Sequence, residues 1–255
     1  MPVGEVYQHP EYYELAFSWR DIGAEVDLFE EVIQRYSGIP VIRMLEVACG
    51  PAPHLCEISA RGYEYVGLDL SRAMLEYASG KARTLRAPAT LMEADMVDFH
   101  LNKTADFAFI LLGSLYIRNT AELRAHFKSM SRALKPGGLY LLDWCISFTA
   151  IEGRHETWTL EREGITVTTT FSARNVNVVE QTIEEILAIE VRDRKEITTL
   201  REATIKRQIF PQEFLLFLAQ QNEFEFVGWW NNWDITQSLD DAQSIQRPIT
   251  VIRRR

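Results

Sequence analysis

The sequence predicts an α/β protein with a doubly wound, mostly parallel sheet and a β-rich antiparallel insertion after the fifth strand. Strand-like and helix-like segments alternate through the first 145 residues, as in a parallel sheet flanked by helices. From Ile146 onward, apolar residues recur at every second position in Thr- and Val-rich segments, which is typical of antiparallel hairpins. We therefore expect one domain over residues 1–145 and 208–255, interrupted by an insertion over 146–207.

The first half of the sheet has a local reason for each element. A helix is predicted before the first strand because apolar residues recur at helical spacing up to the Ser37-Gly38 stop. The first strand is expected over 41–48, followed by a helix that starts near Pro51 and ends at Gly62. A second strand over 64–70 precedes a helix with Ser71 as its expected N-cap.

The remaining strands continue the same alternation. A short third strand is expected over 90–92 and an apolar fourth strand over 105–112. A helix opened by the capping box of Asn119 and Glu122 then leads, through a Pro-Gly-Gly stop, to a fifth strand over 139–144. After the insertion, a helix over 211–221 and strands over 224–230 and 249–253 complete a seven-stranded sheet.

The composition indicates a globular protein without a metal or nucleic-acid site. Apolar residues make up 47% of the 255 residues, and the net charge of −9 disfavours binding to nucleic acid. The cysteines Cys49, Cys56 and Cys145 are odd in number and lack CxxC spacing, so we expect neither disulfides nor zinc. The N-terminus lacks a leader pattern and the longest apolar stretch is short, so we expect a cytoplasmic protein without membrane association.

The turn over 45–53, with the sequence LEVACGPAP, is the most informative segment. Small residues at the carboxyl edge of a parallel sheet let a cofactor approach the backbone. Asp69 follows Gly50 by 19 residues, close to the spacing of about 20 for an acidic residue that binds ribose hydroxyls. The turn does not fit GxGxxG, and Pro51 and Pro53 remove backbone donors that a pyrophosphate would use. A ribose-bearing cofactor other than a dinucleotide is therefore predicted.

At these residues the chain resembles the class I S-adenosylmethionine-dependent methyltransferases, which have a Rossmann-like fold. Glu46 and Gly50 match the acid and the central glycine of the first family motif, with Ala48 and Ala52 in place of its outer glycines. The segments 67–71, 94–96, 112–115 and 134–138 resemble the following motifs in the same order. The resemblance covers residues 41–145 and implies S-adenosylmethionine as the cofactor.

The family resemblance also implies which residues contact the cofactor. Asp69 would hold the ribose, Asp95 and the backbone of Met96 would meet the adenine, and 112–115 would line the methionine end. Tyr13 either closes over the cofactor or packs the first helix on the sheet, and His54 either touches the cofactor carboxylate or faces solvent. The residues assigned to the cofactor are Tyr13, Glu46, Ala48, Cys49, Gly50, Asp69, Leu70, Met74, Asp95, Met96, Leu112, Gly113 and Ser114.

The sequence specifies the acceptor site less well than the cofactor site. The insertion resembles the hairpins that cover the acceptor in small-molecule N- and O-methyltransferases, and the competing interpretation is an interface between two copies in a homodimer. Aromatic faces would suit a cationic or planar acceptor, although core packing is the alternative for the tryptophans. The candidate acceptor-binding residues are Tyr116, Trp144, Trp158, Arg201 and Trp230.

Two residues are candidates for a general base. Asp143 ends the fifth strand and His155 lies at the start of the insertion; a structural carboxylate and a surface histidine are the respective alternatives. Cys49 lacks a histidine at a recognisable partner spacing and is interpreted as packing.

The predicted function is an S-adenosylmethionine-dependent methyltransferase acting on the nitrogen or oxygen of a small molecule. A sulfonium is an activated methyl donor, so the protein mainly aligns the reactants and excludes water. This explains why the donor site has a sequence pattern while the acceptor site has none. The alternatives are a nicotinamide-dependent oxidoreductase, which would use pyrophosphate-binding glycines, and a non-catalytic binding module on the same fold.

Overall fold

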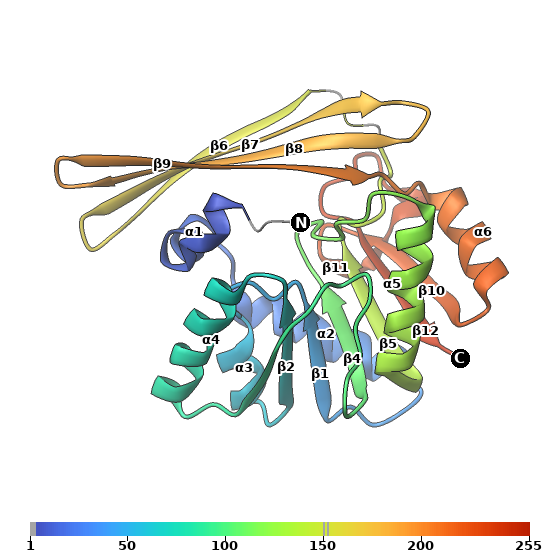
Figure 1. The fold of residues 1–255 in the computed structure, drawn as a ribbon. Helices are drawn as coiled ribbons and strands as arrows, with labels where there is room; N and C mark the ends of the chain where they lie inside the picture. The colour runs from blue at the N-terminus through green and yellow to red at the C-terminus, as the bar shows by residue number, and fades with distance from the viewer. Residues whose placement is uncertain (1–3, 150, 152) are drawn as a thin grey trace.

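The computed structural model describes residues 4–149, 151 and 153–255 and contains two β-sheets. The large sheet is flanked by helices, and the small sheet lies across the carboxyl ends of its parallel strands (Figure 1). The chain enters the small sheet after the fifth strand and returns from it to the large sheet. The predicted α/β class with an antiparallel insertion is confirmed.

The large sheet has the strand order β11-β10-β12-β5-β4-β1-β2-β3. The five strands from β5 to β3 are parallel to one another, and β12, β10 and β11 continue the sheet in antiparallel fashion. Its strands are β1 (Arg43–Val47), β2 (Glu64–Asp69), β3 (Ala89–Glu93), β4 (Ala105–Ile110), β5 (Leu134–Asp143), β10 (Phe224–Asn231), β11 (Asp234–Ser238) and β12 (Ile249–Arg254).

The expected number of seven strands is wrong by one. Asn232 and Trp233 both have positive φ angles, and they turn the chain back so that β11 pairs with β10. The segment DITQS of β11 is short and mostly polar, so it carries no strand pattern. The segment forms a strand because it pairs with β10 at the edge of the sheet, and not because its own residues favour a strand.

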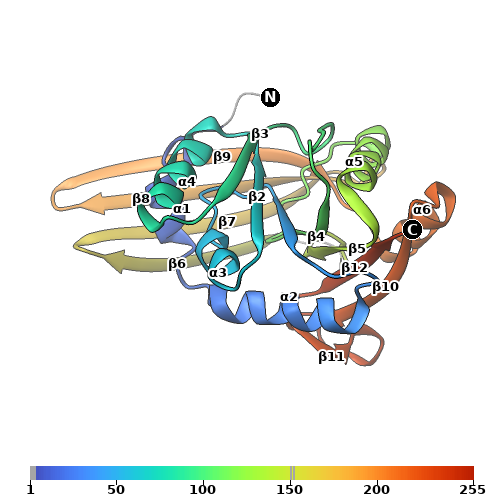
Figure 2. The same ribbon diagram turned by 90° about the horizontal axis from the view of Figure 1, so that it is seen from below.

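Helices cover both faces of the large sheet. The helices of the described chain are η1 (Glu5–Gln8), α1 (Pro10–Ala16), α2 (Ile22–Tyr36), α3 (Leu55–Ala60), α4 (Arg72–Leu85), α5 (Thr120–Ala133), α6 (Pro211–Gln221) and η2 (Leu239–Asp241). Apolar residues of α2 and α3 pack on the face that carries Phe107 and Phe109, while α5 and α6 pack on the opposite face (Figure 2). Alternate residues of β4 therefore enter different cores, which is why this strand is apolar throughout.

The two helix caps predicted from the sequence, Ser71 and Asn119, are present in the structure. Ser71 accepts a hydrogen bond from the Met74 N–H at the start of α4, and Asn119 accepts one from the Glu122 N–H at the start of α5. Helix α2 begins at Ile22, because the side chain of Asp21 caps it by accepting a hydrogen bond from the Ala24 N–H. Helix α3 begins only at Leu55, because the residues before it form the turn after β1.

The small sheet consists of four antiparallel strands in the order β6-β7-β8-β9. They are β6 (Arg154–Arg162), β7 (Ile165–Asn177), β8 (Thr182–Asp193) and β9 (Glu196–Arg207). Val167, Ile189 and Leu200 form an apolar patch against Val6 and Leu15 of the N-terminal segment. Helix α1 thus lies between the small sheet and α4, above the edge where the parallel strands end (Figure 1).

Among the described residues, no helix has the length and apolar character needed to cross a membrane.

Candidate active site

The turn after β1 has an alternating backbone conformation. Ala48, Gly50 and Ala52 have φ angles of 55°, 52° and 51°, so every second residue of the turn is left-handed. Glycine adopts this conformation freely, whereas alanine does so at a cost of about 1–2 kcal/mol per residue. The two alanines therefore keep the backbone of a Gly-x-Gly-x-Gly turn without its outer glycines.

Asp69 fixes this turn to the end of β2. Its carboxylate accepts hydrogen bonds from the Gly50 N–H and from the Ser71 N–H, each over 2.7 Å. Burial raises the pKa of Asp69 above its ordinary value, and the two N–H donors oppose that shift. The carboxylate is held at the sheet edge beside the turn, where it can receive hydroxyl groups of a ribose.

His54 lies buried between two carboxylates. Its Nδ1 is 2.8 Å from Oε1 of Glu46, and its Nε2 is 2.9 Å from Oε2 of Glu25. Burial alone would lower the pKa of His54, but the charge of Glu46 and the hydrogen bonds to both carboxylates outweigh it, so the pKa is raised. The Tyr65 hydroxyl donates to the other oxygen of Glu46 over 2.6 Å. His54 therefore holds Glu46 in place rather than facing solvent.

The buried charges continue to the end of β5. Glu25 is paired with Arg20 and, over 3.0 Å, with Arg247, which is also 3.0 Å from Oδ2 of Asp143. Asp143 is completely buried and also accepts a hydrogen bond from the Leu112 N–H over 3.0 Å. We call the residues Arg20, Glu25, Glu46, His54, Asp143 and Arg247 the buried charge network. This network joins the turn after β1 to the turn after β4.

Two adjacent cavities open beside these turns. The smaller, of about 370 Å³, lies against the turn after β1, and its lining includes Glu46, Gly50 and Arg20. The larger, of about 940 Å³, lies between the large and small sheets. Four residues line both cavities: Tyr13, Phe17, Leu112 and Ser114. The arrangement suits two ligands that meet at this shared wall.

The N-terminal segment forms the roof over the shared wall. The backbone carbonyl of Tyr7 accepts a hydrogen bond from Ser71 over 2.9 Å, and that of Ala16 accepts one from the Trp158 indole over 2.6 Å. Tyr13 packs on Phe17 with a ring separation of 4.6 Å. Burial raises the pKa of Tyr13 to about 12, so its hydroxyl stays neutral. This segment is thereby attached both to Ser71 after β2 and to the small sheet.

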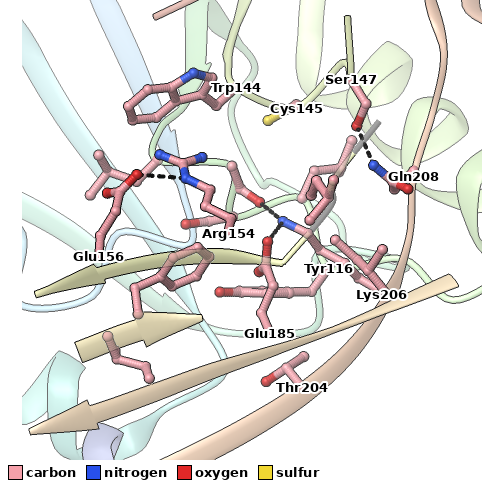
Figure 3. Close-up of a pocket in the computed structure, with 18 of the residues that line it drawn as sticks. Tyr116, Trp144, Cys145, Ser147, Arg154, Glu156, Glu185, Thr204, Lys206 and Gln208 are labelled. Atoms are coloured by element: carbon pink, nitrogen blue, oxygen red, sulfur yellow. Dashed lines mark hydrogen bonds and ion pairs between the residues drawn. The ribbon is translucent and has the colours of Figure 1, made fainter. Parts of the chain in front are cut away.

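Polar and charged side chains line the larger cavity, as Figure 3 shows. Arg154 lies near the rings of Trp144 and Phe171, with its guanidinium carbon 5.1 Å and 5.6 Å from their centroids, and it pairs with Glu156. Deeper in the cavity, Lys206 contacts Glu185 and the Tyr116 ring. The lining can bind an acceptor with both cationic and hydrogen-bonding groups.

The cofactor residues expected from the sequence do not all line the same cavity. Seven of them line the smaller cavity: Tyr13, Glu46, Ala48, Cys49, Gly50, Leu112 and Ser114. Gly113 lines the larger cavity, and Asp69 touches the turn. The other four expected residues, Leu70, Met74 and the adenine-end residues Asp95 and Met96, lie outside the lining of both cavities. There Asp95 is exposed, the side chain of Met74 is buried, and Leu70 is 42% exposed.

The expected acceptor residues are also divided. Tyr116, Trp144 and Trp158 line the larger cavity. Arg201 is exposed and does not, because Glu202, Thr204 and Lys206 of the same strand point into the cavity and Arg201 lies on the opposite face. Trp230 packs on Tyr36 of α2, at a ring separation of 5.2 Å.

Neither candidate base lines a cavity. The carboxylate of Asp143 accepts hydrogen bonds from Arg247 and from the Leu112 N–H, so its role is structural. His155 is an exposed residue of β6. Sequence reasoning missed the buried charges Arg20, Glu25 and Arg247, which meet only through folding. It also missed Glu185 and Lys206, although polar residues at every second position of β9 signal a polar inner face.

The chain is similar to known methyltransferases. A family model for a methyltransferase domain matches residues 44–138. The Streptomyces venezuelae enzyme named dTDP-3-amino-3,4,6-trideoxy-alpha-D-glucopyranose N,N-dimethyltransferase is 30% identical over 164 residues, which are 62% of this chain and 67% of the relative. The Saccharopolyspora spinosa enzyme named dTDP-4-amino-2,3,4,6-tetradeoxy-D-glucose N,N-dimethyltransferase is 33% identical over 112 residues, only 43% of either chain.

A solved structure extends the similarity beyond the cofactor-binding half. It is a sugar N-methyltransferase from Streptoalloteichus, 25% identical, with a TM-score of 0.76 over all of this chain and 95% of that chain.

Proposed function

This chain belongs to the S-adenosylmethionine-dependent methyltransferases that act on small molecules, and on that premise we propose that it methylates the amine nitrogen of an amino sugar. The cofactor is S-adenosylmethionine. The observation that carries the proposal is the wall shared by the two cavities, because it lets a donor in one cavity meet an acceptor in the other. The choice of an amino sugar as the acceptor is supported by two relatives that are named as N,N-dimethyltransferases of amino sugars.

We assign the donor to the smaller cavity and to the adjoining edge of β2. Arg20 and Glu46 carry charges that match the carboxylate and ammonium groups of the methionine end. Asp69 would accept hydrogen bonds from the ribose hydroxyls, and Asp95 and Met96 would flank the adenine. When bound, the cofactor supplies an electrophilic methyl group on a sulfonium. The residues of this chain position that methyl at the wall formed by Tyr13 and Ser114.

We place the acceptor in the larger cavity under the small sheet, where residues of the insertion 146–207 face Tyr116 and Trp144 of the large-sheet domain. A cavity of about 940 Å³ lies at the upper end of the range for small-molecule sites. It is large for a free monosaccharide and suits a sugar attached to a larger group. The polar lining of Arg154, Glu156 and Gln208 fits hydroxyl and charged groups on such a molecule.

Nitrogen is favoured over oxygen as the methyl acceptor because a neutral amine has a reactive lone pair, whereas an alcohol must lose its proton to a base. Within the described part of the chain, the larger cavity is lined by no histidine. Among the residues that the structure describes, three carboxylates line this cavity. Glu156 and Glu185 are paired with Arg154 and Lys206, and burial raises the pKa of Glu202 above its ordinary value. The chain would act by alignment and by excluding water from the methyl group.

The test is release of S-adenosylhomocysteine with matched acceptors. The purified protein is given S-adenosylmethionine with dTDP-3-amino-3,4,6-trideoxy-α-D-glucopyranose or with the analogue that carries a hydroxyl in place of the amine. We expect release only with the amine. Release with the hydroxyl analogue alone, or with neither sugar while the cofactor binds, would contradict amine methylation of sugars.

A further inference from the structure

A buried ion pair in the larger cavity has no part in the function described so far. Lys206 of β9 and Glu185 of β8 lie 2.8 Å apart, between Nζ and Oε1, and their side chains are only 11% and 13% exposed. Figure 3 shows the two side chains meeting inside the cavity, beside Tyr116. A buried pair of opposite charges contributes little net stability, because removing both charges from water offsets their attraction. Stability alone therefore gives a weak reason for this pair.

The pair is attached to the turn where the two cavities meet. Lys206 donates a hydrogen bond to the backbone carbonyl of Gly113 over 2.7 Å. The N–H of Gly113 donates to the carbonyl of Asp143 over 2.9 Å, so the turn is held from both sides. A Cβ atom on Gly113 would come within 3.2 Å of the Trp144 carbonyl oxygen and 3.5 Å of Lys206 Nζ. Lys206 thus packs closely on this turn and fixes the small sheet to it.

This geometry determines where the Glu185 carboxylate lies. Leu112 and Ser114, on either side of Gly113, line both cavities, so Lys206 reaches the wall between donor and acceptor. Glu185 is bound to the same ammonium group and also lines the larger cavity. One oxygen of the carboxylate faces Lys206. The other can accept a hydrogen bond from a molecule in the cavity.

From this arrangement we propose that Glu185, held by Lys206, binds the N–H groups of the reacting amine and orients its lone pair toward the donor. The inference rests on the proposed function and adds the residue that recognises the reacting nitrogen. Methyl transfer moves positive charge from the sulfonium to the nitrogen, and a nearby carboxylate stabilises that charge as it develops. Lys206 acts as a positioning residue, because it touches Glu185 and Gly113 and keeps the carboxylate at the shared wall.

The experiment compares the variants Glu185→Gln, Lys206→Met and Glu184→Gln with the wild type. Glu184 is the matched control: it is the neighbouring residue, lies outside the cavity lining and pairs with Arg174 over 2.7 Å. For each protein, kcat and KM are measured with dTDP-3-amino-3,4,6-trideoxy-α-D-glucopyranose. The dissociation constant of S-adenosylhomocysteine and the melting temperature are measured in parallel.

We expect Glu185→Gln to lower kcat/KM for the amine by about 10- to 150-fold, the range that one charge-assisted hydrogen bond accounts for. Lys206→Met should lower kcat/KM in the same direction, and Glu185→Asp should restore part of the loss. Glu184→Gln should match the wild type. The variants at Glu185 and Glu184 should bind S-adenosylhomocysteine within about twofold of the wild type, because neither side chain lines the smaller cavity.

Three results would overturn the inference. If wild type and Glu185→Gln have equal kcat/KM for the amine, the inference fails while the proposed function stands. If Glu185→Gln weakens cofactor binding and lowers the melting temperature as much as it lowers kcat/KM, the pair is structural. A wild-type protein that methylates no amino sugar overturns the proposed function, and this inference falls with it.

Discussion

The backbone N–H of Gly50 donates a hydrogen bond to Oδ2 of Asp69 over 2.7 Å. This contact joins the turn after β1 to the end of β2, two positions that are 19 residues apart in the chain. The Gly50 N–H and the Ser71 N–H together fix the orientation of the Asp69 carboxylate, and with it the direction of its remaining lone pairs. The position of the carboxylate to which we assign the ribose therefore depends on the turn itself.

Replacing Asp69 by alanine should weaken S-adenosylmethionine binding by at least about tenfold, because each charge-assisted bond to a ribose hydroxyl contributes about 1.5–3 kcal/mol. Cys49→Ala is the control, since Cys49 is buried beside the same turn and offers mainly packing. Titration calorimetry gives both dissociation constants. Equal affinity of wild type and Asp69→Ala would refute the ribose role.

His54 should make a pH-dependent contribution to stability. Its pKa is raised above 6.5 in the folded protein, so the protonated form is favoured by folding. The contribution is fully present below about pH 6.5 and is lost as the pH rises through the higher folded pKa. The pKa of Glu25 lies well below its usual range, so this carboxylate stays ionised across that window and adds no slope.

The measurement is guanidinium-induced unfolding of wild type and His54→Gln at about pH 6 and about pH 9. At the lower pH the variant should be less stable by about 3–5 kcal/mol, because two buried carboxylates lose a charged partner. The difference should shrink at the higher pH. A difference that stays constant or grows with pH would show that His54 is neutral in the folded protein.

Asp143→Ala should reduce stability rather than catalysis in the folded enzyme. The substitution leaves the Leu112 N–H without its acceptor and removes one of the two carboxylate partners of Arg247, the other being Glu25, which should cost about 1–3 kcal/mol of unfolding free energy. Thermal unfolding measures this loss, and turnover is then compared per folded molecule with saturating cofactor. A variant of unchanged stability that has lost its turnover would restore Asp143 as the general base.

Trp158 and Arg201 should differ in their effect, although the sequence places both in the insertion. Trp158 holds the carbonyl of Ala16 and packs on Phe17, which lines both cavities. Trp158→Ala should therefore raise the KM of the acceptor and also weaken cofactor binding, by about tenfold for the lost hydrogen bond and packing. Arg201→Ala should leave both constants unchanged. Steady-state kinetics check this, and an effect of Arg201→Ala on the acceptor KM would contradict the assigned strand face.

The turn after β1 and its contact with the end of β2 could be predicted because these residues are close in sequence order and fixed by local rules. The turn from Glu46 to Ala52 follows one strand, and Asp69 ends the next, so adjacency in the sheet follows from the βαβ order. Alanine in a left-handed conformation at positions 48 and 52 could not be read from composition. It required the backbone geometry.

The acceptor half could be predicted only in part: Tyr116, Trp144 and Trp158 line the larger cavity, but other residues meet there through long-range pairing. Glu185 faces the cavity and Glu184 does not, and a shift of one residue in register would exchange them. Arg201 was assigned to the wrong strand face for this reason. The buried charge network could not be predicted from the sequence either, because folding brings Glu25 and Arg247 together from opposite ends of the chain.

Transfer of a labelled methyl group is the most direct test of the central claim. The protein is incubated with S-adenosylmethionine carrying a ¹³C-labelled methyl and with dTDP-3-amino-3,4,6-trideoxy-α-D-glucopyranose, and the product is examined by carbon and proton correlation NMR. The label should appear in a methyl group bonded to the sugar nitrogen, together with an equal amount of S-adenosylhomocysteine per methyl transferred. A labelled methyl bonded to oxygen or carbon, or a sugar recovered without label while the cofactor binds, would contradict it.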